Sequence, residues 1–198
     1  MVEARATRRE FVSRAFLTTA AGAALLAPEA AAAGAAESDA AILSRALEVE
    51  QLVSIAYGRV LSSHVLTPAV ARQVSVQWGH EREHIDALAR ALRAMGASVP
   101  AAPASLAAAE KGLATHHVKA GLANLSTQHD CLVLLVDVES AAEAAYFSAL
   151  AKLSDVRLLK MAAEIMGCEA QHWSVLSAIS HRDQVYRYVP YPFVEGAA

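Results

Sequence analysis

Four stretches of the chain carry apolar residues every three or four positions, with an acidic residue on the same stripe. These stretches surround Glu50, Glu81, Glu139 and Glu169. Such spacing is typical of helices that bury one face. It predicts helices over residues 38–63, 68–95, 126–153 and 155–179. The expected apolar inward positions include Leu43, Leu47, Leu61, Trp78, Leu88, Leu92, Leu132, Leu135, Leu150, Leu176 and Ile179.

The connections between these helices predict how they are arranged. Residues 64–67 and Ser154-Asp155 form short turns, so each pair of helices folds into an antiparallel hairpin. Residues 97–125 contain Pro100, Pro103 and one weakly helical piece, and they are long enough to run the length of a bundle. The expected fold is therefore all-α: a four-helix bundle of two hairpins with a long crossover between the second and third helices.

The two hairpins resemble each other in sequence. A shift of 89 residues places Glu50 on Glu139 and Tyr57 on Tyr146, and a shift of 88 residues places Glu81 on Glu169 and His84 on His172. The chain thus contains an internal repeat. A pseudo-two-fold axis between the hairpins would bring the four glutamates together at the centre of the bundle.

The repeated acidic and imidazole groups predict a metal site. Positions i and i+3 share one face of a helix, so Glu81 and His84 point to one place, as do Glu169 and His172. With Glu50 and Glu139 from the other two helices, they form the ligand set of a dimetal centre in a four-helix bundle. Four buried carboxylates would repel one another, whereas two divalent cations would balance their charge.

Other residues near these groups are candidates for supporting roles. We expect Tyr57 and Tyr146, two turns after a glutamate, to form hydrogen bonds with ligand carboxylates; plain packing and electron transfer are the alternatives. Glu143 lies one turn after Glu139 and is either a seventh metal ligand or a channel or solvated carboxylate. His80 and Cys168, each directly before a ligand glutamate, are expected to pack between helices.

The cysteines are expected to remain free thiols. Cys131 lies eight residues, about 12 Å along a helix, from the level of Cys168, which is too far for a disulfide. Two cysteines also exclude a cysteine-rich zinc module or a dense disulfide framework. His116 and His117 fall in the crossover and are expected to face solvent.

Composition adds limits to this interpretation. The chain has 198 residues, 19% charged residues and a net charge of −3, which suits one globular domain, placed at residues 37–180. There is no basic stripe to bind nucleic acid. The mean hydropathy of +0.30 reflects alanine-rich stretches, and we expect no transmembrane helix in the mature protein. Residues 181–198 have no helical period and are expected to form an extended aromatic tail that packs over the bundle, with a partner-binding strip as the alternative.

The first 36 residues predict export. They combine a positive start, an apolar stretch over residues 16–27 and a small-residue region with several cleavage options, as in a signal peptide. Arg8 and Arg9, followed after one residue by Phe11 and Val12, resemble a bacterial twin-arginine signal, which exports folded proteins. We therefore expect a soluble mature protein, beginning near Ser38, in the periplasm, at the cell surface or outside the cell. An ordinary secretion signal that happens to contain two arginines is the alternative.

The pattern of Glu50, Glu81-x-x-His84, Glu139 and Glu169-x-x-His172, with its long second connection, resembles the ferritin-like superfamily. The resemblance is to exported ferritin-like domain proteins in particular, and it covers residues 38–180. It implies a left-handed bundle in which Glu50, Glu81 and His84 form one half of the site and Glu139, Glu169 and His172 the other. The chain lacks the Cys-x-x-Cys iron module of rubrerythrins, and nothing in it identifies a storage-cage surface.

The expected cofactor is a pair of iron or manganese ions, because oxygen-rich ligation with one imidazole per metal suits Fe(II) or Mn(II). Six protein ligands leave coordination positions open for O2 or H2O2 as a small-molecule substrate. The function expected is redox chemistry of the ferroxidase type, with peroxidase or catalase-like activity of the same centre also open. The alternatives are metal binding without turnover and a structural or stress-related bundle. The sequence leaves open the choice of iron or manganese, the electron donor and any homo-oligomer.

Overall fold

The structure is a computed structural model that describes residues 37–119 and 121–188. The predicted signal segment and the last ten residues of the tail, 189–198, lie outside the described residues. Within the described part of the chain the secondary structure is entirely helical, as expected. The elements are α2 (Asp39–Leu61), α3 (Pro68–Ala94), α4 (Leu106–Thr115), α5 (Gln128–Leu150), α6 (Val156–Ser180) and the short 3-10 helix η1 (Val185–Arg187).

The helix boundaries follow from local capping chemistry. Ser38 caps α2 by accepting a hydrogen bond from the backbone N–H of Ala41. Thr127 and Asp130 form a reciprocal capping box at the start of α5, and Asp155 caps α6. Such side chains satisfy backbone N–H groups that have no partner within the helix. The four long helices consequently begin and end within about three residues of the ranges predicted from periodicity.

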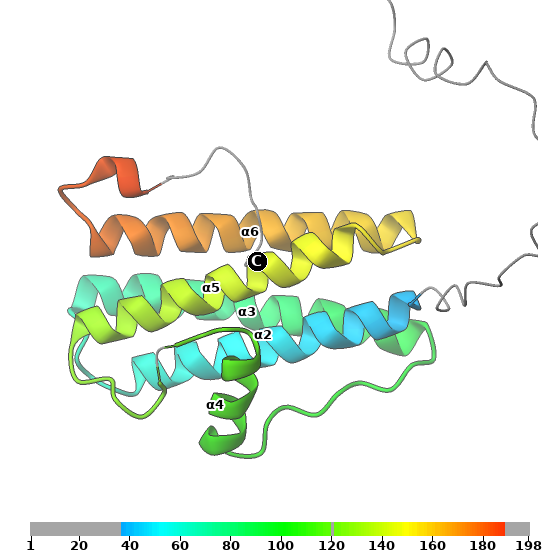
Figure 1. Cartoon of the computed structure of the whole chain (residues 1–198), viewed down its shortest axis with the longest axis horizontal. Coiled ribbons are helices and arrows are strands. Elements are labelled where there is room, and N and C mark those ends of the chain that lie inside the picture. The colour runs from blue at the N-terminus through cyan, green and yellow to red at the C-terminus, as the bar shows by residue number, and fades with distance from the viewer. Residues whose placement is uncertain (1–36, 120, 189–198) are drawn as a thin grey trace, which may run out of the picture. The chain divides into compact units, whose positions relative to one another are not determined.

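The four long helices form two antiparallel hairpins, as predicted (Figure 1). Helix α2 packs along α3 and α5, and α5 packs along α6. Asp39 at the start of α2 joins the two hairpins: its carboxylate accepts hydrogen bonds of 2.9 Å from the backbone N–H groups of Ser154 and Asp155. This contact fixes the end of one hairpin against the turn of the other.

The crossover between α3 and α5 contains helix α4, which packs against α2. Ala109 and Leu113 are the buried residues of α4. A Cβ atom at Gly112 would come within 2.8 Å of Leu52 Cδ2, so glycine permits the close approach of the two helices here. His117 is exposed, as expected, whereas His116 is half-buried, and burial lowers its pKa.

The apolar interior consists of two clusters. One, around Tyr57 and Leu135, contains the buried apolar residues between positions 49 and 60 of α2 and most of the buried residues of the first half of α5. The other, around Leu43 and Tyr146, contains the buried apolar residues between positions 42 and 47 of α2 and between positions 88 and 92 of α3. On α3 and α6 the predicted ligand positions lie between the residues of the two clusters, and on α2 and α5 they lie among residues of the first. The candidate site therefore occupies the middle of the bundle, with apolar side chains beyond it in both directions.

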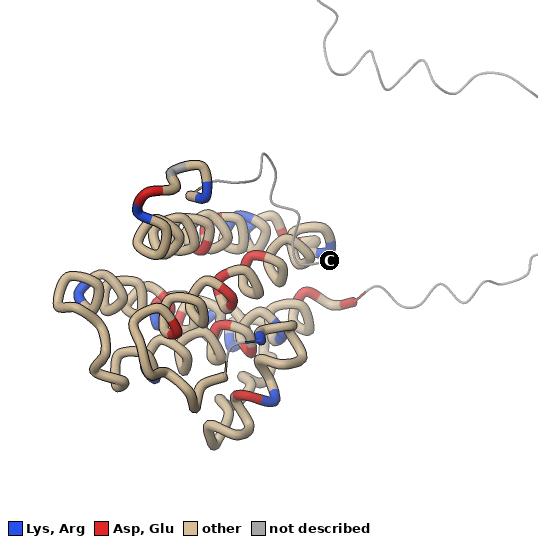
Figure 2. Tube along the Cα trace, turned by 60° about the vertical axis from the view of Figure 1, so that its left-hand side comes forward, with Lys and Arg blue, Asp and Glu red and all other residues tan. Residues whose placement is uncertain are grey.

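Two further features concern the surface and the tail. Figure 2 shows Lys and Arg segments scattered among Asp and Glu segments over the helices. No described helix has the length and apolar character needed to cross a membrane.

Residues 181–188 differ from the expected extended tail: they form a turn and η1, and the Tyr188 hydroxyl donates a hydrogen bond of 2.7 Å to the Arg182 carbonyl. This local bond closes a compact turn instead of an extended strip.

Candidate metal centre

The structure brings all six predicted ligand residues to one place in the bundle. In one half, His84 Nδ1 lies 2.8 Å from Glu169 Oε1, 3.7 Å from Glu50 Oε2 and 3.8 Å from Glu81 Oε2. These four residues come from α2, α3 and α6. Each offers one ligand atom, and these atoms lie within 4.8 Å of one another. A group of this size and donor type can hold one metal ion.

The other half repeats this arrangement around His172. Its Nδ1 lies 2.9 Å from Glu81 Oε1, 3.2 Å from Glu169 Oε2 and 3.4 Å from Glu139 Oε1. These ligand atoms also lie within 4.8 Å of one another. Glu81 and Glu169 belong to both groups. The expected division into two separate triads therefore becomes two overlapping groups that share a pair of carboxylates.

The buried carboxylates have more acceptor atoms than the protein satisfies. Glu50, Glu81, Glu139 and Glu169 are all 0% exposed. Three of their oxygens, Glu50 Oε2, Glu81 Oε2 and Glu139 Oε2, have no hydrogen-bond partner, whereas Glu81 Oε1 and Glu169 Oε1 each pair with a histidine Nδ1, at 2.9 and 2.8 Å. A buried polar atom without a partner is costly. Divalent cations would satisfy these oxygens, so the residues present fit the metal pair that the donor set implies.

Burial and mutual contacts shift the pKa values of the residues at this site. Burial, followed by repulsion from Glu169, raises the pKa of Glu50 and Glu139 well above the usual carboxyl value. Burial also raises the pKa of Glu169, but hydrogen bonds with His172 and His84 outweigh it and lower that pKa to about 2. Burial lowers the pKa of both histidines, yet their contacts with Cys168 and the carboxylates raise it overall. Metal ions would have to displace the protons of these groups.

Two tyrosines form hydrogen bonds with the ligand carboxylates, as the sequence predicted. The Tyr146 hydroxyl donates to Glu50 Oε1 at 2.5 Å, and the Tyr57 hydroxyl donates to Glu139 Oε1. Each bond crosses from one hairpin to the other, because Tyr57 and Glu50 lie on α2 while Tyr146 and Glu139 lie on α5. Burial and the nearby carboxylates raise the pKa of both phenols, which keeps them protonated donors.

Glu143 lies outside both ligand groups. Its side chain is half-buried, and burial with repulsion from Glu169 raises its pKa. Its position one turn after Glu139 brings it near the centre without bringing its carboxylate among the ligand atoms. Of the two roles predicted for Glu143, the structure favours a carboxylate beside the site.

His80 and Cys168 do more than pack between helices. His80 Nδ1 lies 3.0 Å from His172 Nε2, and Cys168 Sγ lies 3.4 Å from the same nitrogen. Cys168 and Cys131 form no disulfide, as expected. The sequence signal for the contact of His80 and Cys168 with His172 was their equivalent place in the repeat, one residue before each ligand glutamate. Because each residue lies about 100° around its helix from that glutamate, we expected it to pack between helices instead.

Comparison with known proteins agrees with this geometry. A family model described as a ferritin-like domain matches residues 38–182. Neither the curated proteins nor the solved structures contain a match to the chain. The match extends over the four long helices and includes all six residues of the candidate site.

Proposed function

Because this chain belongs to the ferritin-like family, we propose that it binds two iron or manganese ions and carries out redox chemistry with O2 or peroxide. The observation that supports this most directly is that four fully buried carboxylates and two histidines converge in two groups, with three carboxylate oxygens left without a hydrogen-bond partner. Oxidation of Fe(II) by O2, a ferroxidase activity, is the reaction we favour. The predicted signal peptide adds the proposal that the protein acts after export, which the location and N-terminus of the mature protein would test.

The residues assigned to the ions follow from the two overlapping groups. Glu50 and His84 would hold one ion, Glu139 and His172 the other, and Glu81 and Glu169 would be shared by both. Donors that are mostly carboxylate oxygens with one imidazole for each ion suit Fe(II) and Mn(II). When bound, such a pair supplies electrons to a small oxidant or accepts them from a reductant.

The chain's own residues prepare this site in three ways. The apolar clusters on both sides limit water around the carboxylates and strengthen their electrostatic interactions. Tyr57 and Tyr146 orient the carboxylates of Glu139 and Glu50 through hydrogen bonds. The carboxyl groups of Glu50 and Glu139 hold protons in the metal-free chain and release them when ions bind.

Replacing Tyr57 or Tyr146 by phenylalanine is expected to weaken metal binding about tenfold or more, because the orientation of one carboxylate is lost. The free energy of unfolding should fall by about 1–3 kcal/mol for each change, as a buried acceptor loses its donor. Isothermal titration and urea unfolding measure the two effects. Tyr186→Phe is the matched control, since Tyr186 is exposed and its hydroxyl donates a hydrogen bond to Gln184, away from the candidate site. Affinity unchanged in both variants would show that the tyrosines only pack.

Anaerobic addition of Fe(II), followed by air, tests the proposed reaction. We expect rapid O2 consumption at a rate above that of Fe(II) in buffer, repeated when more Fe(II) is added. Uptake of two ions without O2 consumption would instead indicate metal binding without turnover. Uptake of no ions would indicate a structural bundle and would contradict the proposal. Glu143→Gln serves as control, because its carboxylate lies outside both ligand groups.

A further inference from the structure

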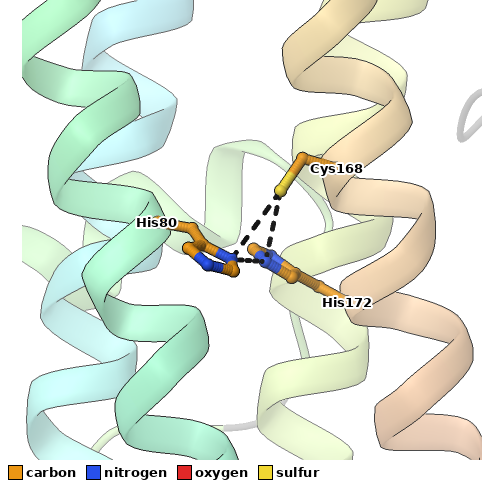
Figure 3. Close-up of side chains that lie close together, drawn as sticks. All are labelled: His80, Cys168 and His172. Carbon is orange, nitrogen blue, oxygen red and sulfur yellow. Dashed lines mark hydrogen bonds between the residues drawn. The ribbon is translucent and has the colours of Figure 1, made fainter.

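His172 uses its two ring nitrogens toward two different sets of residues. Its Nδ1 faces the carboxylates of Glu81, Glu139 and Glu169, as described above. Its Nε2 faces outward, toward His80 Nδ1 at 3.0 Å and Cys168 Sγ at 3.4 Å. Figure 3 shows His80 on α3 pointing across to Cys168 and His172 on α6. Because the imidazole ring is rigid, a hydrogen bond at Nε2 also fixes the direction in which Nδ1 points.

The relative orientation of the two imidazole rings identifies the contact as a hydrogen bond. The ring planes differ by 12° and the ring centroids are 5.3 Å apart. The centroid separation equals the 3.0 Å distance between His80 Nδ1 and His172 Nε2 plus the distance from each nitrogen to the centre of its own ring. Both nitrogens therefore lie on the line that joins the two ring centroids. An N–H on one ring therefore points directly at the lone pair of the other.

The same geometry disfavours a third metal ion among these three residues. An ion shared by two imidazoles in tetrahedral coordination lies about 2.1 Å from each nitrogen, with the nitrogens about 3.4 Å apart. Their lone pairs would then converge on a point off the line between the rings. Here the lone pair and the N–H face each other along that line.

We propose that His80 is a positioning residue, which accepts a hydrogen bond from His172 Nε2–H. This inference rests on the proposed function, in which Nδ1 of His172 needs a free lone pair to hold an ion. The ring proton must then stay on Nε2, and His80 Nδ1 is the acceptor in line with it. Ligand histidines commonly use the second nitrogen in this way, which fixes their tautomer and orientation.

The two halves of the site differ in the residue that can accept a hydrogen bond from the ligand histidine. The position that His80 occupies in the first hairpin is occupied by Cys168 in the second. A thiol is a weaker hydrogen-bond acceptor than an imidazole nitrogen. His84 therefore has no second histidine at the equivalent place, and we expect the ion held by His172 to bind more tightly than the ion held by His84.

The hydrogen bond can be tested without any metal. In the metal-free full chain labelled with 15N-histidine, the bond predicts a through-hydrogen-bond N–N coupling between His172 Nε2 and His80 Nδ1. The coupling should disappear in His80→Ala and persist in His129→Ala, a control at an exposed histidine of α5. Absence of the coupling in the wild-type chain would overturn the inference.

Co(II) titration tests the positioning role itself. His80→Ala should weaken binding of one of two ions about 10- to 100-fold, and His80→Asn should restore most of it, because the amide oxygen can accept the same N–H. Two ions bound with wild-type affinity in His80→Ala would overturn this role alone, whereas no uptake by the wild-type chain would overturn the proposed function. A thiolate-to-Co(II) absorption band that Cys168→Ser removes would show that His80, Cys168 and His172 bind an ion together. That result would also contradict the inference.

Discussion

Glu81→Gln is expected to reduce metal uptake from two ions per chain to fewer than one. Glu81 belongs to both ligand groups, with one oxygen 2.9 Å from His172 Nδ1 and the other 3.8 Å from His84 Nδ1. Glutamine keeps the size of the side chain but removes the negative charge and replaces one of the two ligand oxygens by an NH2 group, which cannot bind a metal ion. Metal analysis after anaerobic loading with Fe(II) and removal of free ions measures the effect.

Two matched variants separate this explanation from general damage to the bundle. Glu50→Gln affects a residue of one group only, so it should cost one ion and leave the other. Glu143→Gln changes a nearby half-buried carboxylate that belongs to neither group, and it should keep both ions. Two ions retained by folded Glu81→Gln would show that the carboxylates are not shared.

Divalent metal is expected to raise the melting temperature, and by more at about pH 8 than at about pH 6. With free ion at 100 times its Kd, each site adds about 2.7 kcal/mol of stability. For a domain of this size that corresponds to a rise of about 5–11 °C for each site. Thermal unfolding of the metal-free and Mn(II)-loaded chains at both pH values measures the shift.

The direction of this pH dependence follows from the shifted groups. The pKa of His84 and His172 is raised above the ordinary 6.5, so their protonation stabilises the metal-free fold below that pH, and the contribution is lost as pH rises through the folded pKa. The raised carboxyl groups of Glu50 and Glu139 change in the same direction above 4.5. Glu169, whose pKa is lowered, loses its contribution only as pH falls toward about 2.

Metal ions compete with the same protons, so their affinity increases as pH rises. Over this range the metal-free chain loses the stability that these protons supply, whereas the metal-bound chain, which no longer holds them, does not, so the shift increases with pH. Glu81→Gln should show almost no shift at either pH. A shift that is equal or smaller at the higher pH would mean that ions bind without displacing these protons.

Periodicity predicted most of the fold because each helix carries its own pattern. The stripe around Glu50 and Tyr57 fixes which face of α2 is buried, and the short turns fix the height of each glutamate relative to its hairpin partner. The six candidate ligand positions therefore followed from residue types and spacing alone, and all six lie together in the structure.

Contacts between helices were less accessible from the sequence. Spacing along one helix does not determine how it is rotated against a helix in the other hairpin. The sharing of Glu81 and Glu169, the crossed pairing of Tyr57 with Glu139, and the contact of His80 with His172 all depend on that rotation. The turn of residues 181–188 arises from local hydrogen bonds that no periodic pattern signals.

Anomalous X-ray diffraction from crystals of the chain loaded anaerobically with Fe(II) tests the central claim most directly. Two iron peaks are predicted within the bundle, one beside Glu50 and His84 and the other beside Glu139 and His172, with Glu81 and Glu169 between them. A fully loaded crystal with no iron peak among these six side chains, or with iron bound only at the surface, would contradict the account.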